Sequence, residues 1–334
     1  MAASRSPTSD RPPERPPMTI TRTALALLCT WGTLAPHAQA ASYPERTVTL
    51  TVPYGAGGST DGIAREFARL LGQELKQSVV VLNQPGATGT LQLGNLARAR
   101  PDGYTIGFYS YSTVTFTSQL MKVPYKRDDF TPLGGVAEFS YGIVTAPDSP
   151  INNVKDLVAQ SKTPKGVFYG VTGAPNNFPF LQLHKLTGGK FDQVTYKSSA
   201  ESITAVMGKH VDVALQGPSE YAELVRAGKL KFIASASDFR LPWFPQVPTI
   251  KEQGYDIGIT GIIGVAAPKG IPEDARKTLE AAVQKVVASK PYADFLANEY
   301  GIKNYPASSA EFAKLIDQGF VRMADMIKTF DIKH

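Results

Sequence analysis

The stretch at residues 47–61 reads TVTLTVPYGAGGSTD and indicates the class of the fold. Its first half is β-branched and aliphatic, which indicates a buried strand. Its second half carries three glycines and leads into a helix predicted over 61–76, where apolar residues recur at helical spacing at 63, 67, 70, 71 and 75. A strand, a glycine-rich turn and a helix in this order are typical of one unit of a parallel α/β sheet.

The same alternation continues along the chain. A strand at 78–82, a second glycine turn at 85–89, a helix ending at Arg98 and a strand at 104–108 follow. This order predicts a parallel sheet with helices on both faces. Further strands are predicted at 141–146, 166–171, 192–197, 211–216 and 230–235. Further helices are predicted at 153–161, 177–187, 199–208, 218–227, 272–286, 291–299 and 308–329.

The chain length of 334 residues suggests about two domains, at about 150 residues each. No low-complexity linker separates them, so we expect short strands to cross between the domains, with a cleft between. Domain 1 is predicted to comprise 41–142 and 263–334, and domain 2 to comprise 143–262.

Residues 1–40 have the features of a signal peptide. Arg22 precedes an apolar run at 24–35, and Ala38-Gln-Ala40 forms a cleavage site. The run is shorter than the about 20 apolar residues that a membrane span requires. Residues 1–17 look like an extension ahead of a second possible start at Met18. A buried N-terminal helix is the alternative, but no capping pattern supports it.

Removal of this segment changes the charge and the cysteine count. It contains four Arg and two acidic residues, so the net charge falls from +6 to +4, and the single cysteine, Cys29, is lost. No disulfide or thiolate zinc site can form, and the four histidines show no metal-ligand spacing. The basic residues are scattered along predicted helices, which argues against nucleic acid as a partner.

The glycine loop at 54–61 is the strongest candidate for a binding site. Glycines allow close backbone approach to a ligand, and the first turn of the next helix presents unpaired N–H groups, so the loop favours an anion. It lacks the Lys of a Walker loop and the third Gly of a dinucleotide fingerprint, so no nucleotide cofactor is expected. The alternative is that Thr60 or Asp61 simply caps a helix.

Other predicted strand ends carry similar polar loops. Because such loops meet at one edge of a parallel sheet, we expect them to surround a small carboxylate, with Tyr196 beside Lys197 facing the cleft. The predicted ligand-binding residues are Tyr54, Ala56, Gly57, Gly58, Ser59, Thr60, Asp61, Thr88, Gly89, Thr90, Ser110, Ser112, Thr172, Gly173, Asn176, Asn177, Tyr196, Lys197 and Gln216.

Catalytic patterns are weak. Residues 217–221 lack the final Gly of a nucleophile elbow, and His184 and His210 lie in or beside predicted helices without a serine partner. We therefore nominate no catalytic residue, no metal and no cofactor. An exported hydrolase that uses the same cleft is the competing class.

Several motifs together resemble the Bug family of periplasmic solute-binding proteins, the receptors of tripartite tricarboxylate transporters. Residues 53–65 read PYGAGGSTDGIAR, 83–89 read NQPGATG and 100–105 read RPDGYT. Further matches follow in order, so the resemblance covers almost all of 43–334. They are VTYK at 194–197, AGKL at 227–230, PQVPTIKEQG at 245–254 and APKGIP at 267–272.

The resemblance implies a type II periplasmic-binding-protein fold, with two α/β domains, two crossover strands and a cleft that closes on a ligand. It implies a periplasmic, monomeric receptor that captures a dicarboxylate, tricarboxylate or aromatic acid and presents it to membrane transporter subunits. A sensor kinase is the alternative partner. Ser198-Ser199 replaces the family's usual Gly-Gly, and 262–264 lack a frequent Trp, so the identity of the ligand stays open.

Overall fold

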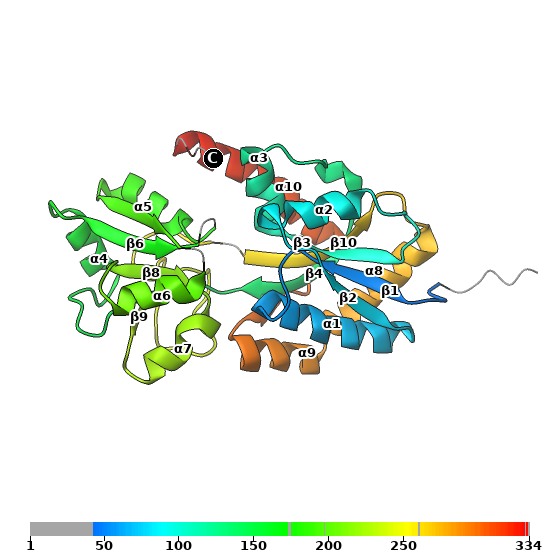
Figure 1. Cartoon of the computed structure of the whole chain (residues 1–334), viewed down its shortest axis with the longest axis horizontal. Coiled ribbons are helices and arrows are strands. Elements are labelled where there is room, and N and C mark those ends of the chain that lie inside the picture. Colours follow the sequence, from blue (N-terminus) through cyan, green and yellow to red (C-terminus); the bar gives the residue numbers. More distant parts are fainter. Residues whose placement is uncertain (1–42, 173–174, 197, 260, 331, 333–334) are drawn as a thin grey trace, which may run out of the picture. The chain divides into compact units, whose positions relative to one another are not determined.

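Figure 1 shows the chain as a computed structural model. It describes residues 43–172, 175–196, 198–259, 261–330 and 332. The predicted signal peptide, Gly173 and Lys197 lie outside these residues. Residues from Tyr43 onward form one unit, and the predicted boundaries between two domains within it stay a prediction.

Two sheets organise this unit (Figure 1). The first has the strand order β11-β4-β10-β3-β1-β2 and the second has the order β7-β6-β8-β5-β9. The first comprises β1 (Val48–Val52), β2 (Val79–Asn83), β3 (Thr105–Ser110), β4 (Phe130–Phe139), β10 (Gly261–Pro268) and β11 (Lys303–Asn304). The second comprises β5 (Gly142–Thr145), β6 (Val167–Val171), β7 (Phe191–Thr195), β8 (Val213–Gln216) and β9 (Lys231–Ser235).

Neither sheet is purely parallel, so the prediction of a parallel sheet was only partly right. β1 pairs in parallel with β2 and β3, and β6 with β7 and β8, as predicted. However, β10 is antiparallel to β3 and β4, and β5 is antiparallel to β8 and β9. The chain passes from the first sheet to the second after β4 and returns before β10. The antiparallel pairs involve the strands that flank these two crossings, β4, β5, β9 and β10. The strands that pair within a strand–helix–strand unit do so in parallel.

The sequence reading missed β4, β10 and β11. β4 reads FTPLGGVAEF, and its Pro132, Gly134 and Gly135 conceal a strand pattern. β10 reads GIIGVAAP and is buried throughout, so it shows no alternation of apolar and polar residues. Its pairing with β4 also contains two register shifts.

Helices cover both faces of each sheet, and every predicted helix is present (Figure 1). On the first sheet, α1, α8 and α9 share one core cluster, while α2 and α10 contribute to the other. On the second sheet, α4 and α5 pack on one face and α6 and α7 on the other. The helices are α1 (Ser59–Leu75), α2 (Thr90–Ala97), α3 (Ser118–Leu120), α4 (Val154–Ser161), α5 (Phe178–Thr187), α6 (Ser199–Met207), α7 (Pro218–Arg226), α8 (Glu273–Val287), α9 (Lys290–Phe295) and α10 (Ser309–Thr329). Short helical turns occur at η1 (Ala87–Gly89), η2 (Thr113–Thr117), η3 (Arg127–Asp129) and η4 (Leu296–Tyr300).

The apolar stripe predicted for α1 forms much of the first core. Ile63, Phe67 and Leu71 are fully buried, whereas Leu70 is only partly buried at the edge of the cluster. Among the described residues, none of the helices combines the length and the apolar character that a membrane span needs.

Two chain segments cross between the sheets. The first is Ser140–Tyr141, between β4 and β5, and the second runs from 236 to the start of β10. They are hydrogen-bonded to each other: the Tyr141 N–H donates to Ser237 Oγ at 3.1 Å, and the Ala236 N–H donates to the Tyr141 carbonyl at 2.9 Å. The crossings therefore lie side by side, next to the residues that line the cavity described below.

Candidate ligand-binding cavity

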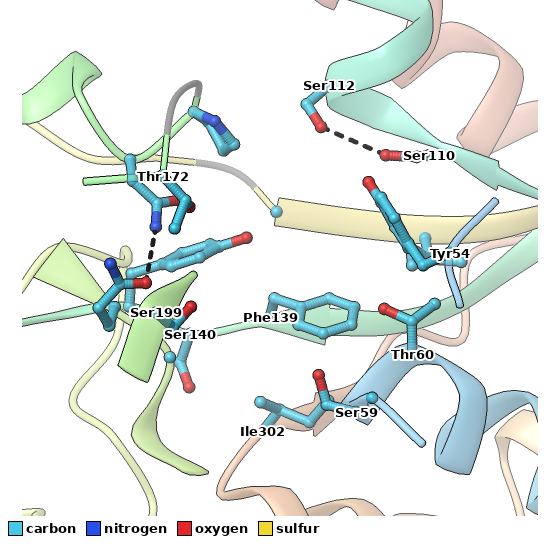
Figure 2. A pocket seen from close by; sticks show the side chains of 18 of the residues that line it. Tyr54, Ser59, Thr60, Ser110, Ser112, Phe139, Ser140, Thr172, Ser199 and Ile302 are labelled. Carbon is cyan, nitrogen blue, oxygen red and sulfur yellow. Dashed lines mark hydrogen bonds between the residues drawn. The ribbon is translucent and has the colours of Figure 1, made fainter. Parts of the chain in front are cut away.

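A cavity of about 370 Å³ is lined by residues from both sheets (Figure 2). This volume is at the small end of the range for small-molecule sites. The lining is rich in hydroxyl groups. It comprises Tyr54, Gly58, Ser59, Thr60, Thr88, Ser110, Ser112, Thr113, Thr117, Phe139, Ser140, Tyr141, Thr172, Pro175, Asn176, Ser199, Gln216, Gly217, Pro218, Ser219, Glu220, Gly261, Ile262, Ile263, Tyr300 and Ile302.

The glycine loop before α1 is held in place by Asp61. The Gly57 N–H and Arg65 Nε both donate to Asp61 Oδ2 at 2.9 Å. Asn83 Nδ2 donates to Asp61 Oδ1 at 2.9 Å and to the Tyr54 carbonyl at 2.9 Å. Gly57 has φ +88°, a conformation that side chains rarely adopt. These bonds fix the path of residues 54–58 along the cavity.

The first turn of α1 therefore opens onto the cavity. Gly58 is the N-cap residue and provides no side-chain cap. The Gly62 N–H donates to the Gly58 carbonyl at 3.0 Å, but helix geometry leaves the amides of Ser59 and Thr60 without intrahelical acceptors. Figure 2 shows both side chains at the cavity, on the same side as Tyr54. Amides at a helix start carry partial positive charge and bind anions.

Hydroxyl groups extend this polar edge across the end of β3. Ser110 Oγ and Ser112 Oγ lie 3.2 Å apart in a hydrogen bond (Figure 2). Burial raises the pKa of the Tyr54 hydroxyl, and hydrogen bonding with Thr113 and Ser110 offsets part of that effect. Thr88, in the turn η1 before α2, also lines the cavity. Such hydroxyls can donate to a carboxylate and carry no charge of their own.

Gln216, at the end of β8, lines the cavity and has an unused donor. The residue is 1% exposed. Its Oε1 accepts from Asn176 Nδ2 at 3.3 Å, and the same Nδ2 donates to the Leu215 carbonyl at 3.0 Å. Gln216 Nε2 is buried and has no partner in the described part of the chain. A buried donor without a partner is costly, so this amide is suited to a ligand's acceptor atom.

More than one helix start points at the cavity. Ser59 of α1, Ser199 of α6 and Pro218 of α7 are each the first residue of their helix, and each lines the cavity. Among the described lining residues there is no Lys or Arg, and the sole carboxylate is Glu220. Among these described residues, the positive potential comes from helix ends and polar hydrogens.

Ten of the predicted ligand-binding residues line the cavity. They are Tyr54, Gly58, Ser59, Thr60, Thr88, Ser110, Ser112, Thr172, Asn176 and Gln216. Seven do not line it: Ala56, Gly57, Asp61, Gly89, Thr90, Asn177 and Tyr196. Gly173 and Lys197 lie outside the described residues. That any of these residues binds a ligand stays a prediction.

The residues away from the cavity have other contacts. Tyr196 packs at the edge of the core cluster shared by α6 and α7, beside His210 in a shallow second hollow, instead of facing the cavity. Asn177 Nδ2 donates to Gln193 Oε1 at 3.1 Å, and Thr90 Oγ1 donates to the Ala87 carbonyl at 2.8 Å. Asp61 acts on the cavity through the glycine loop.

Sequence reasoning missed the lining residues that come from the crossovers and from the strands it did not find. Phe139, Ser140 and Tyr141 belong to β4 and the first crossing, and Ile262 and Ile263 belong to β10. No local motif marks them, because their position depends on how the sheets pair. Ser199 and Ser219 also line the cavity. They belong to the polar segments that follow predicted strands, so the same pattern could have identified them as candidate ligand-binding residues.

A metal is not suggested by the residues present: the described part of the chain has no group of three or more His, Cys, Asp or Glu side chains arranged to hold an ion. The chemistry of the cavity is instead that of hydrogen-bond donors arranged around a small space.

The profile of the tripartite tricarboxylate transporter family receptors, TctC, matches residues 63–332. The chain belongs to this family. It is 31% identical over 277 residues to Protein BugT of Bordetella pertussis, which covers 81% of this chain and 85% of that protein. The resemblance to Bug proteins found in the sequence is thereby confirmed.

Several solved structures have the same fold. A TctC solute-binding protein from Polaromonas aligns with a TM-score of 0.74 and 27% identity, covering 86% of this chain and 99% of that chain. An R. palustris protein with adipate aligns with a TM-score of 0.76 and 26% identity, covering 87% and 99%. MatC from Rhodopseudomonas palustris with bound malate aligns with a TM-score of 0.71 and 25% identity, covering 85% and 100%. The chain has the type II periplasmic-binding fold that the sequence predicts.

Proposed function

We propose that this TctC-family receptor is a periplasmic protein that captures a small organic carboxylate in the cavity and delivers it to membrane subunits of a tripartite tricarboxylate transporter. The protein acts as a monomer and by binding, without catalysis. The two sheets with their helices close around the ligand. The carboxylate-bound relatives from R. palustris support the ligand class.

The observation that carries this proposal is that Gln216, which has a free buried donor, and the uncapped start of α1 line the same cavity. A carboxylate has several lone-pair sites and can accept from amides, hydroxyls and a side-chain amide together. The Ser59 and Thr60 amides and the hydroxyls of Ser110 and Ser112 supply donors without a fixed cation. Uncharged donors of this kind bind a small acid and permit its release.

Gln216→Glu tests the proposal with little change in shape. One oxygen of the new carboxylate can still accept from Asn176. The other oxygen takes the place of the free Nε2 donor and repels an anionic ligand. A hydrogen bond to a charged group contributes about 1.5–3 kcal/mol, so we expect Kd to rise at least about tenfold. Isothermal titration of the purified protein with dicarboxylates, monocarboxylates and aromatic acids measures this.

Gln73→Glu is the matched control, because it adds the same charge at an exposed position on α1. Its affinity should equal that of the wild type. If the wild-type protein binds an acid and Gln216→Glu binds it equally well, the carboxylate does not use this cavity.

A sensor kinase in place of transporter subunits is the alternative partner. Uptake of the labelled ligand distinguishes the two: cells that lack this protein lose uptake if it feeds a transporter. Intact uptake with a lost transcriptional response to the acid would identify a signalling receptor and contradict the transport role.

A further inference from the structure

Glu220 is the one carboxylate among the described residues that line the cavity. A carboxylate is not expected in a site for a ligand with several negative charges. We propose that Glu220 selects the ligand at its second end, so that the receptor prefers an acid with one carboxylate and a distal amino or amide group over a dicarboxylate or tricarboxylate. This inference rests on the proposed function and narrows its substrate class.

The position of Glu220 follows from the start of α7. The helix begins at Pro218, its N-cap Gly217 has no side chain, and Glu220 lies in the first turn. Ser219 Oγ donates to Glu220 Oε2 at 3.0 Å. A Cβ placed on Gly217 would lie 2.8 Å from Glu220 Oε2, so the carboxylate folds back over the helix start. The protein's own acid thus occupies the α7 helix end, where an anionic ligand group would otherwise bind.

No cation of the described residues neutralises this carboxylate. Within the described part of the chain, Glu220 takes part in no ion pair, and its hydrogen bonds come from Ser219 and from its own N–H. Burial raises the pKa of Glu220, and those hydrogen bonds offset part of the rise. Tyr141, whose pKa is also raised by burial, feels the negative charge of Glu220 as a further cause.

The two sides of the cavity therefore differ in what they offer a ligand. The first-sheet side presents the open start of α1 with the hydroxyls of Ser110 and Ser112, all donors for a carboxylate. The α7 side presents a partly buried acceptor. A second ligand carboxylate placed there would meet a like charge with little water between, whereas an ammonium or amide group would donate to Glu220.

The simplest alternative is that Glu220 only balances the helix dipole of α7. An acid in a first turn is common for that reason. If Glu220 only has that role, replacing it should not change which ligand the protein prefers. Comparing the ligand preference of the wild type and a Glu220 variant therefore distinguishes the two interpretations.

Ligands matched in length provide the test. Adipate, hexanoate and 6-aminohexanoate share six carbons, and succinate, butyrate and 4-aminobutyrate share four. We expect the purified wild-type protein to bind the amino acid of the preferred length with a Kd at least tenfold lower than that of the matched dicarboxylate, as measured by isothermal titration.

Glu220→Gln should reduce the ratio of the dicarboxylate Kd to the amino acid Kd at least tenfold. The main cause should be tighter binding of the dicarboxylate. Glu223→Gln is the control, since Glu223 is on the same helix with its side chain 84% exposed, and its ratio should equal that of the wild type. Thermal unfolding of both variants shows that they fold.

A wild-type preference for the dicarboxylate, or an unchanged ratio in Glu220→Gln, overturns this inference and leaves the receptor function standing. If neither these six acids nor a set of aromatic acids binds, both the receptor proposal and this inference are overturned.

Discussion

Replacement of Asp61 by Ala should destabilise the protein and impair the cavity at the same time. The substitution removes acceptors for the Gly57 N–H, Asn83 Nδ2 and Arg65 Nε, each at 2.9 Å. Asp61 is only 3% exposed, so the first two bonds contribute about 1 kcal/mol each. The Arg65 side chain is 56% exposed, and its solvated ion pair adds between about 0 and 1 kcal/mol.

The expected loss is therefore about 2–3 kcal/mol in the free energy of unfolding at pH 7. Urea unfolding followed by circular dichroism measures it. Asp317→Asn is the control, since Asp317 forms a surface pair with Arg127 and is 72% exposed; it should cost about 0–1 kcal/mol. Ligand affinity should also fall in Asp61→Ala, because the loop at 54–58 loses its anchor.

The pH dependence gives this prediction a second readout. The hydrogen bond from Arg65 is the largest cause that lowers the pKa of Asp61, to about 2, with further lowering by Gly57 and Asn83. A folded-state pKa below the ordinary value of 3.8 means that the ionised carboxylate is favoured by folding. Its stabilisation is present above pH 4 and is lost as the pH falls toward 2.

The difference in unfolding free energy between wild type and Asp61→Ala should accordingly shrink from pH 4 to pH 2. A difference below about 0.5 kcal/mol at pH 7, or one that does not change with pH in this window, would refute the assignment of Asp61 as the residue that positions the loop.

Two further predictions concern glycines. Gly57→Leu should reduce the ligand-induced rise in melting temperature at a stability cost of about 1–2 kcal/mol, because a side chain at φ +88° strains the loop at 54–58 although no atom lies within 4 Å of the added Cβ; an undiminished thermal shift would show that this loop does not position the binding site. Gly264→Ala should reduce the free energy of unfolding by about 3 kcal/mol or more, since the new Cβ would lie 2.1 Å from Phe312 and 2.5 Å from the Gly134 carbonyl. Gly55→Ala, with no atom within 4 Å and no positive φ, should stay within about 0.5 kcal/mol in the same urea titration and serves as its control.

Much of the fold could be predicted because its signals are local. The apolar stripe of α1 and the strand–glycine–helix order at 47–61 each depend on a few neighbouring residues. The pairing of β10 between β3 and β4 could not be predicted, since it joins segments more than 100 positions apart and β10 has no alternating pattern. The antiparallel pairs of β10 depend on that pairing, and those of β5 with β8 and β9 depend on where the chain enters the second sheet.

The candidate site divides in the same way. Ser59, Thr60 and Gln216 follow strands found in the sequence, so the rule that ligands bind at strand ends located them. Tyr141 and Ile263 line the cavity only because the crossovers and β10 lie beside it. Asp61 was predicted as a ligand-binding residue, but it does not line the cavity and instead accepts hydrogen bonds from Gly57 and from Asn83 of another strand.

A crystal structure of the protein with the tightest-binding acid from the titrations would show whether the acid lies in this cavity. We predict one acid in the cavity, with a carboxylate oxygen within about 3.2 Å of the Ser59 or Thr60 amide and another ligand atom accepting from Gln216 Nε2. An acid bound outside this cavity, or inside it with Gln216 Nε2 still unpaired and the start of α1 unoccupied, would contradict the account.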